Sequence, residues 1–350
     1  MISVSIVNVT SYTALELLRV LAHHPQFVVT SVTGRSAVGK RLSDVFPQLL
    51  AQSAIDAMLV ITEEAAQTEL AFVCLPHAAA AETVLRLLER GTKVVDLSAD
   101  FRLHDARIYE TWYKHTHPAP TLLATTPYGL CERHREQTAY ATLVANPGCY
   151  ATASILALIP ALAAGIIHES IIIDAKSGVS GAGRSPSLTT LYDEANENIN
   201  AYSLDGHRHL PEIVQELEAA ATDGGYAVTG RLRVTFIPHL VPMTRGILAT
   251  CYTDLRDTAM TTKDVLEVYE KYYVDEPFVR VVEQSPHTKW SYGSNTCFIH
   301  PFVDTRTQRL VVVSCLDNLV KGAAGQALQN ANILFGLSET TGLLALAVYP

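Results

Sequence analysis

The stretch ANPGCYATA at residues 145–153 places a cysteine where a strand pattern ends and a helix pattern begins. The N–H groups of a first helical turn are unpaired and carry partial positive charge. They favour the thiolate form of a cysteine and can hold a developing oxyanion. Cys149 is therefore the candidate nucleophile. For the cysteines within apolar strands we predict buried structural thiols, the usual state of free cysteine. These are Cys74, Cys251, Cys297 and Cys315.

A thiol nucleophile needs a proton acceptor, and GHRHLPEI at residues 206–213 offers two histidines. On an extended chain His207 and His209 share a face, and Pro211 and Glu212 indicate that a helix starts directly after them. The alternative is that the two histidines and Glu212 ligate zinc or iron. Because the sequence holds no further cluster with ligand spacing, we predict no metal site.

The stretch KSGVSGAGR at residues 176–184 is a glycine-rich loop. Gly178, Gly181 and Gly183 would let the backbone approach a ligand closely. Arg184 offers a planar fork for a carboxylate or a phosphate. Any tight loop could have this composition, so the pattern alone is not specific.

Near the N-terminus SIVNVTSYTALELL has the strand–turn–helix layout of a dinucleotide-binding turn, but without glycine. The hydroxyl groups of Thr10, Ser11 and Thr13 and the start of the helix can still bind phosphate. The second strand is followed by Arg35 and Ser36, with no acidic residue to bind a ribose 2′-hydroxyl. This pair suits a 2′-phosphate, so NADP is favoured over NAD.

Length and composition describe a globular chain of two domains. The 350 residues are 48% hydrophobic and 17% charged, which is ordinary for folded proteins. The net charge of −9 and the absence of any Lys/Arg run argue against a nucleic-acid partner. The six separated cysteines and the lack of a signal-like N-terminus predict a reduced, cytoplasmic protein.

The apolar segment ATASILALIPALAAGII, residues 151–167, tests the membrane alternative. It contains Pro160 and Gly165 and is short for a membrane span. We therefore predict a buried helix that runs into a buried strand, and no membrane partner.

Strand and helix patterns alternate before Cys149, which predicts a parallel sheet with helices on both faces. The expected strands are residues 2–9, 27–33, 69–76, 93–98 and 142–146. After Cys149 the β-rich stretches have longer connections, which predicts an α+β domain with a large mixed or antiparallel sheet. A last helix, from Asp317 to Leu334, is expected to return to the first domain.

A series of sequence blocks, in order along nearly the whole chain, resembles the N-acetyl-gamma-glutamyl-phosphate reductase family, which is related to aspartate-semialdehyde dehydrogenase. The blocks are SYTALELLRVLAHHP, LPHAAA, DLSADFRL, YGLCE, NPGCYAT, KSGVSGAGR, GHRHLPEI, FIPHLVPMTRGI and DNLVKGAAGQALQNAN. The resemblance implies a Rossmann-type NADP(H)-binding domain at residues 1–148 and 317–350. It also implies a catalytic and oligomerisation domain at residues 149–316, in a homodimer or homotetramer.

The resemblance also implies roles for individual residues. Cys149 is the nucleophile, and His209, or else His207, is the acid/base. The residues implied to bind the cofactor are Thr10, Ser11, Tyr12, Thr13, Arg35, Ser36, Pro76, His77, Ser180, Gly181, Gly183 and Asn318. The candidates for binding the substrate are Arg184 for its phosphate, and Arg102 and Arg245 for its carboxylate.

The implied reaction belongs to arginine biosynthesis. NADPH reduces an acyl phosphate, N-acetyl-L-glutamyl 5-phosphate, to the 5-semialdehyde through a Cys149 thioester, and phosphate is released. Aspartyl phosphate and carrier-bound aminoadipyl phosphate are alternative substrates. A metal-dependent hydrolase that uses His207, His209 and Glu212 is an alternative of another class.

A third alternative, a homologue that binds no cofactor, comes from departures in the first turn. The family turn is typically Gly-Ala-Ser-Gly-Tyr-Thr-Gly, and its glycine positions hold Asn8, Ser11 and Ala14 here. Asparagine is among the few residues that adopt the left-handed conformation, so we expect the turn to be kept. Cys131 stands where the family usually has proline, and we interpret that change as neutral.

Overall fold

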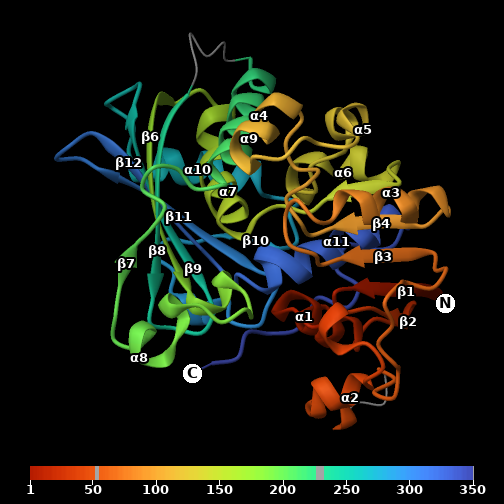
Figure 1. Cartoon of the computed structure of the whole chain (residues 1–350). Coiled ribbons are helices and arrows are strands. Elements are labelled where there is room, and N and C mark those ends of the chain that lie inside the picture. The colour runs from red at the N-terminus through yellow and green to blue at the C-terminus, as the bar shows by residue number, and fades with distance from the viewer. Residues whose placement is uncertain (52–54, 226–231, 350) are drawn as a thin grey trace. The chain divides into compact units, whose positions relative to one another are not determined.

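The computed structural model describes residues 1–51, 55–225 and 232–349, and the chain forms two compact units (Figure 1). The first unit comprises Met1–Gly148 and Ala323–Ala345. The second comprises Cys149–Gly322 and the C-terminal residues from Leu346 on.

The first unit contains a five-stranded sheet in the order β2-β1-β3-β4-β5, and every pair in it is parallel. This confirms the predicted Rossmann-type domain, whose strands are apolar because both faces of the sheet are covered. The strands are β1 (Ile2–Val7), β2 (Phe27–Val32), β3 (Leu70–Val73), β4 (Lys93–Asp96) and β5 (Leu143–Ala145). The helices are α1 (Tyr12–Leu21), α2 (Leu42–Val45), α3 (Ala81–Glu89), α4 (Ala106–Tyr113), α5 (Pro120–Thr125), α6 (Cys131–Ala139) and α11 (Gly325–Leu334), with short 3₁₀ turns η1 (Arg35–Ala37) and η2 (Pro47–Ala51).

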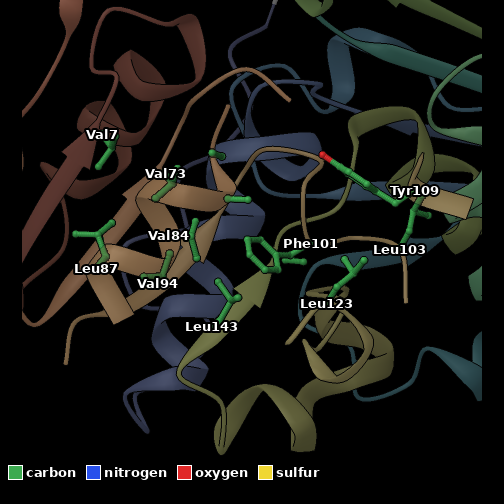
Figure 2. Close-up of a cluster of buried hydrophobic side chains, with 14 residues drawn as sticks. Val7, Val73, Val84, Leu87, Val94, Phe101, Leu103, Tyr109, Leu123 and Leu143 are labelled. Carbon is green, nitrogen blue, oxygen red and sulfur yellow. The ribbon is translucent and has the colours of Figure 1, made fainter. Parts of the chain in front are cut away.

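A buried cluster joins the central strands of this sheet to three helices of the same unit (Figure 2). Strands β3, β4 and β5 each contribute a side chain, and α3, α4 and α5 cover them. The labelled members from these elements are Val73, Val94, Leu143, Val84, Leu87, Tyr109 and Leu123. This packing fixes where the loops after the strands leave the sheet, which is the edge that binds ligands in folds of this kind.

The second unit contains a seven-stranded mixed sheet in the order β10-β11-β12-β9-β6-β8-β7. The β6–β8 and β10–β11 pairs are parallel and the other pairs are antiparallel. The strands are β6 (Ile167–Gly178), β7 (Asn200–Ala201), β8 (Arg233–Val241), β9 (Ile247–Leu255), β10 (Val279–Val281), β11 (Cys297–Asp304) and β12 (Arg309–Leu316). The helical elements are α7 (Cys149–Ala163), α8 (Tyr192–Ala195), α9 (Leu210–Asp223), α10 (Thr262–Tyr272), η3 (Val179–Ala182), η4 (Leu188–Thr190), η5 (Thr288–Trp290) and the π-helical turn η6 (Val320–Ala324).

Helices α7, α9 and α10 lie on one side of this sheet (Figure 1). The buried helix α7 is followed directly by the strand β6, as predicted for residues 151–167. Within the described part of the chain, no helix is long and apolar enough to cross a membrane.

The opposite side of the sheet carries an apolar row of residues that are paired directly across four strands. The row is Ile172, Tyr252, Val311 and Phe302. Its two end residues are 45% and 43% exposed, so this row lies on a surface of the unit.

The C-terminal segment differs from the single helix predicted for residues 317–334. It starts with a non-helical stretch and the π-helical η6, and only α11 is regular. Helix α11 packs on α1, α6 and β4 in the first unit, whereas residues 317–322 belong to the second unit. The domain boundary predicted at residue 317 therefore differs from the division at residue 323.

Candidate active site

Cys149 is the first residue of α7 and is partly exposed, whereas the other five cysteines are buried. Burial raises the pKa of the Cys74 and Cys251 thiols, and raises that of Cys315 to about 12. Gly322 lies against Cys149, because a Cβ at Gly322 would come within 2.8 Å of the Cys149 Cβ. Of the six thiols, Cys149 has the environment that suits a nucleophile.

The two histidines lie beside the residue that follows Cys149. The rings of His207 and His209 are 4.7 Å apart, and the Tyr150 ring is 5.7 Å from the first and 6.0 Å from the second. The structure therefore brings the start of α7 and both candidate bases into one site.

His207 is enclosed by aromatic rings. Tyr150, Tyr202 and Phe236 all contact it edge-on. Its Nδ1 accepts the N–H of His209 at 3.1 Å. Burial, and to a smaller extent the charge of His209, lower the pKa of His207 to about 3. His207 is thus neutral at physiological pH, and its Nδ1 holds the main chain of His209.

His209 occupies the N-cap position of α9 without a capping bond from its side chain, and its Nε2 lies 3.9 Å from Oε1 of Glu212. Glu212 is only 1% exposed, and Pro211 occupies the first turn of α9 as predicted. A buried carboxylate beside an imidazole orients the ring and stabilises its protonated form. The described residues include no group of three or more His, Cys, Asp or Glu that could hold a metal ion.

Two tyrosine hydroxyls complete this side of the site, and the sequence patterns did not indicate either. Tyr202 donates to the Tyr150 hydroxyl at 3.3 Å, and Tyr150 donates to the carbonyl of His239 at 3.0 Å. Burial raises the pKa of Tyr150 and raises that of Tyr202 to about 12. Both hydroxyls therefore stay protonated and act as donors. The position of Tyr150 directly after Cys149 was the available signal.

The glycine-rich loop lies against the turn between β8 and β9. The N–H groups of Gly178 and Ser180 donate to the carbonyls of Gly246 and Thr244. Asn318 donates to the Ser180 hydroxyl at 3.0 Å and accepts the N–H of Gly246 at 2.8 Å. The predicted residues Ser180 and Asn318 are thus in direct contact.

The three candidate substrate arginines have different surroundings. The Arg245 guanidinium lies 3.5 Å from the buried carboxylate of Asp317 and over the ring of Tyr292. Arg184 is exposed in the loop after η3, where Gly183 has a φ of +87°.

The guanidinium of Arg102, in the first unit, is 7% exposed and donates to the carbonyls of Leu97 and Asn146. It is engaged with the main chain three residues before Cys149 in sequence. Its role toward substrate stays a prediction.

The first turn keeps its form without glycine. Asn8 has a φ of +65°, so the expected left-handed conformation is confirmed. Its side chain donates to the carbonyl of Cys74 at the end of β3. Ser11 caps α1 by accepting the N–H of Ala14 at 3.1 Å, and its own O–H can still point to an anion.

The other predicted cofactor residues that belong to the first unit lie on the same edge of its sheet. Arg35 and Ser36 are exposed in η1, directly after β2. A Cβ at Gly34 would lie 3.4 Å from the Thr10 side chain, so this end of β2 touches the first turn.

Pro76 and His77 are exposed in the loop after β3, which neighbours β1 in the sheet. Tyr12 and Thr13 belong to the first turn of α1. Helix-start N–H groups, hydroxyls and an exposed cation on adjoining strand ends fit a phosphorylated dinucleotide.

Comparisons with known proteins agree with this fold. Residues 3–141 match the family model "Semialdehyde dehydrogenase, NAD binding domain", and residues 149–318 match "Semialdehyde dehydrogenase, dimerisation domain". An aspartate semialdehyde dehydrogenase with NADP from Candida albicans has a similar fold, with a TM-score of 0.70 at 15% identity, covering 96% of this chain and 98% of that one. Aspartate semialdehyde dehydrogenase II from Vibrio cholerae, complexed with ASA, gives a TM-score of 0.68 at 16% identity, with the same coverage. Fold and site thus define an oxidoreductase of the semialdehyde dehydrogenase class.

Two relatives narrow this class. An N-acetyl-gamma-glutamyl-phosphate reductase from Dehalococcoides mccartyi is 53% identical over 99% of this chain and 98% of its own length. One from Heliobacterium modesticaldum is 46% identical over the whole of both chains. The chain belongs to the N-acetyl-gamma-glutamyl-phosphate reductase family, which confirms the resemblance found in the sequence.

Proposed function

We propose that the chain catalyses the NADPH-dependent reduction of N-acetyl-L-glutamyl 5-phosphate to the 5-semialdehyde, with release of phosphate, in arginine biosynthesis. The observation that carries the proposal is the partly exposed Cys149 at the start of α7. The ring of the next residue, Tyr150, lies 6.0 Å from that of His209, whose buried partner is Glu212. The names of the full-length relatives supply the substrate.

The chemistry follows from these side chains. The Cys149 thiolate attacks the acyl carbon and a thioester forms. The carbon–oxygen bond to phosphate breaks, and the leaving phosphate takes up a proton from solvent. The N–H groups at the start of α7 stabilise the oxyanion. His209, oriented by Glu212, donates a proton to the alkoxide formed on reduction and accepts it again as the aldehyde leaves. Cys149 is then a thiolate again.

The proposed cofactor is NADP(H), which when bound supplies the hydride for the thioester carbonyl. Thr10, Ser11, Tyr12 and Thr13 would hold its pyrophosphate at the start of α1. Arg35 and Ser36 would bind the 2′-phosphate, since no acidic residue follows β2.

The remaining predicted cofactor contacts come from two other segments. These are Pro76, His77, Ser180, Gly181, Gly183 and Asn318. The bonds among Ser180, Asn318 and Gly246 support a preformed surface for the nicotinamide.

For the substrate we propose Arg245 as the carboxylate anchor and Arg184 as a phosphate contact. Arg245 is the candidate supported by geometry, because Asp317 and Tyr292 fix its guanidinium. Arg102 is the weaker candidate, because its donors serve main-chain carbonyls.

We also propose that the protein works in the cytoplasm as a homodimer or a homotetramer. The six free cysteines agree with a reducing compartment. The apolar row on the seven-stranded sheet, within the region matched by the dimerisation-domain model, is the surface we assign to a second copy.

The test is the reverse reaction, followed as NADPH absorbance. Purified protein should reduce NADP⁺ with N-acetyl-L-glutamate 5-semialdehyde only when inorganic phosphate is added. Aspartate semialdehyde and a carrier-bound aminoadipate semialdehyde serve as alternative substrates, and NAD⁺ as the alternative cofactor. Turnover with either alternative substrate, and none with the proposed one, would overturn the assignment.

A further inference from the structure

Two consecutive residues hold the turn that carries Arg245. Asp317 Oδ2 lies 3.5 Å from Nη1 of Arg245. The next residue, Asn318, accepts the N–H of Gly246 at 2.8 Å. One residue therefore fixes the guanidinium and the other fixes the backbone directly after it, so that the anchor and its turn are held together.

The carboxylate of Asp317 is itself held rigidly. Asp317 is fully buried. Its Oδ2 accepts the N–H of Gly293 at 2.7 Å, and its Oδ1 accepts the N–H of Leu319 at 2.8 Å. Because main-chain donors on both oxygens fix this group, the flexible side chain of Arg245 takes the position that the carboxylate sets.

The ring of Tyr292 is the second group, after Asp317, that contacts the guanidinium of Arg245. The Arg245 Cζ lies 5.8 Å from the centroid of the Tyr292 ring, a geometry in which a cation is attracted by the ring face. Tyr292 precedes Gly293, which bonds to Asp317, and its carbonyl accepts the N–H of Val348. The same short segment thus supports both the ring and the carboxylate.

The segment that positions Arg245 also touches the nucleophile. The carbonyl of Asp317 accepts the N–H of Gly322 at 2.9 Å. Gly322 in turn lies against Cys149, leaving no room for a Cβ. Residues 317–322 therefore link the position of the anion anchor to the position of the thiol.

We propose that Asp317 is a positioning residue, which fixes Arg245 so that the guanidinium binds the substrate carboxylate at a set distance from Cys149. A guanidinium has five N–H donors, so it can bind a carboxylate while it keeps its contact with Asp317. The negative charge beside it lowers the local positive potential and favours a singly charged carboxylate over a doubly charged phosphate. The inference rests on the proposed function for the identity of the substrate.

The test measures protection of Cys149 in the full chain, without turnover. Iodoacetamide is expected to alkylate Cys149, and N-acetyl-L-glutamate, which carries the substrate's carboxylate, should slow the reaction. We compare the half-protecting concentration for wild type, Asp317→Asn, Arg245→Gln and the double variant. Asp193→Asn, which removes an exposed charge from the same unit, is the matched control.

We expect Asp317→Asn to raise the half-protecting concentration about tenfold, equivalent to about 1.4 kcal/mol. In the Arg245→Gln background the same change should have no further effect, since Asp317 acts through Arg245. The alkylation rate without N-acetyl-L-glutamate is measured for each variant, and protection is expressed relative to it. All values for Asp193→Asn should stay within about twofold of wild type.

Equal protection of wild type and Asp317→Asn, additive effects in the double variant, or no protection of wild type would each overturn the inference. If Asp317→Asn does not fold, Tyr292→Leu serves instead, because it removes the ring that contacts the guanidinium. It should likewise weaken protection only when Arg245 is present. Wild-type turnover, measured separately, decides the proposed function, so the two failures are distinguishable.

Discussion

At the scale of single residues, burial distinguishes the two candidate histidines, which the sequence alone could not tell apart. His207 lies among three aromatic rings and accepts a main-chain N–H. His209 faces the carboxylate of Glu212. The spacing His-x-His placed both at the site, but which ring has a carboxylate partner depends on the start of α9.

This difference predicts a large loss of kcat in one variant and a small loss in the other. His209→Asn should lower kcat by about 10² to 10⁴, the usual contribution of a general acid–base, with NADPH binding unchanged. His207→Asn keeps an acceptor for the His209 N–H and should lower kcat less than about tenfold. Steady-state kinetics at pH 7.5 make the comparison, and the reverse ranking would contradict the roles assigned here.

The lowered pKa of His207 also predicts how the free energy of unfolding depends on pH. Its pKa falls from the ordinary value of 6.5 to about 3 on folding, so the unfolded chain binds a proton first as the pH falls. The contribution of neutral His207 to the free energy of unfolding is complete above pH 6.5. It is lost as the pH falls from there toward 3.

Urea unfolding should therefore show a steeper loss of stability for wild type than for His207→Asn, by about 2 kcal/mol between pH 6.5 and pH 5. His168→Asn, at an exposed position on β6, should follow the wild-type curve. Parallel curves for wild type and His207→Asn would show that this imidazole is not held neutral.

At the scale of elements, the loops after β1 and β3 form one supported edge. The Asn8 side chain joins them through the carbonyl of Cys74. In the second loop Ala78 has a φ of +58°, and its N–H donates to the buried carboxylate of Asp100. Both loops thus use the left-handed conformation without glycine, and side-chain bonds hold them there.

Ala78→Gly should stabilise the protein by about 1 kcal/mol, because an alanine in the left-handed region is strained and glycine is not. Ala79→Gly, next to it and outside that region, should give no gain, since it only adds freedom to the unfolded chain. The midpoints of thermal unfolding test the pair. A loss of stability in Ala78→Gly would mean that the surroundings of the loop suit alanine.

The sequence predicted the elements with strong patterns and missed the weak ones. Continuous apolar strands indicated β1 to β5 correctly, and Asn8 was expected in its observed conformation. Helices α5 and α6 were missed, because the first has six residues and the second, CERHREQTA, has no apolar periodicity. The Asp317–Arg245 contact was also missed, since it joins residues 72 positions apart.

The contacts of Cys131 likewise could not be predicted from the sequence. Its thiol, where the family usually has proline, contacts the Asn330 and Gln326 side chains of α11. These contacts come from a helix almost 200 residues later in the sequence, so sequence patterns could not indicate them.

At the scale of the whole molecule, the pairing register of the seven-stranded sheet explains why apolar side chains line up on the surface that we assign to a second copy. Ile172, Tyr252, Val311 and Phe302 are paired directly across four neighbouring strands, and residues paired in this way point to the same face of a sheet. The sequence predicted β-rich stretches in a large mixed or antiparallel sheet after Cys149. The order of the strands, which makes the row continuous, was not available from the sequence.

Ile172→Asp should therefore convert the oligomer to a smaller species at micromolar concentration, because it puts a charge into an apolar contact. Tyr140→Asp in the first unit, at a side chain that is 93% exposed, is the matched control and should leave the mass unchanged. Sedimentation velocity measures both. An unchanged mass for Ile172→Asp would place the interface on another surface.

The central claim is that Cys149 carries the acyl group. The most direct test is the intact mass of the protein after it is mixed with N-acetyl-L-glutamyl 5-phosphate, without NADPH, and quenched in acid. We expect one N-acetylglutamyl adduct per chain, mapped to Cys149, with release of one equivalent of phosphate, and neither in Cys149→Ala. An adduct on another residue, or turnover by Cys149→Ala at the wild-type rate, would contradict it.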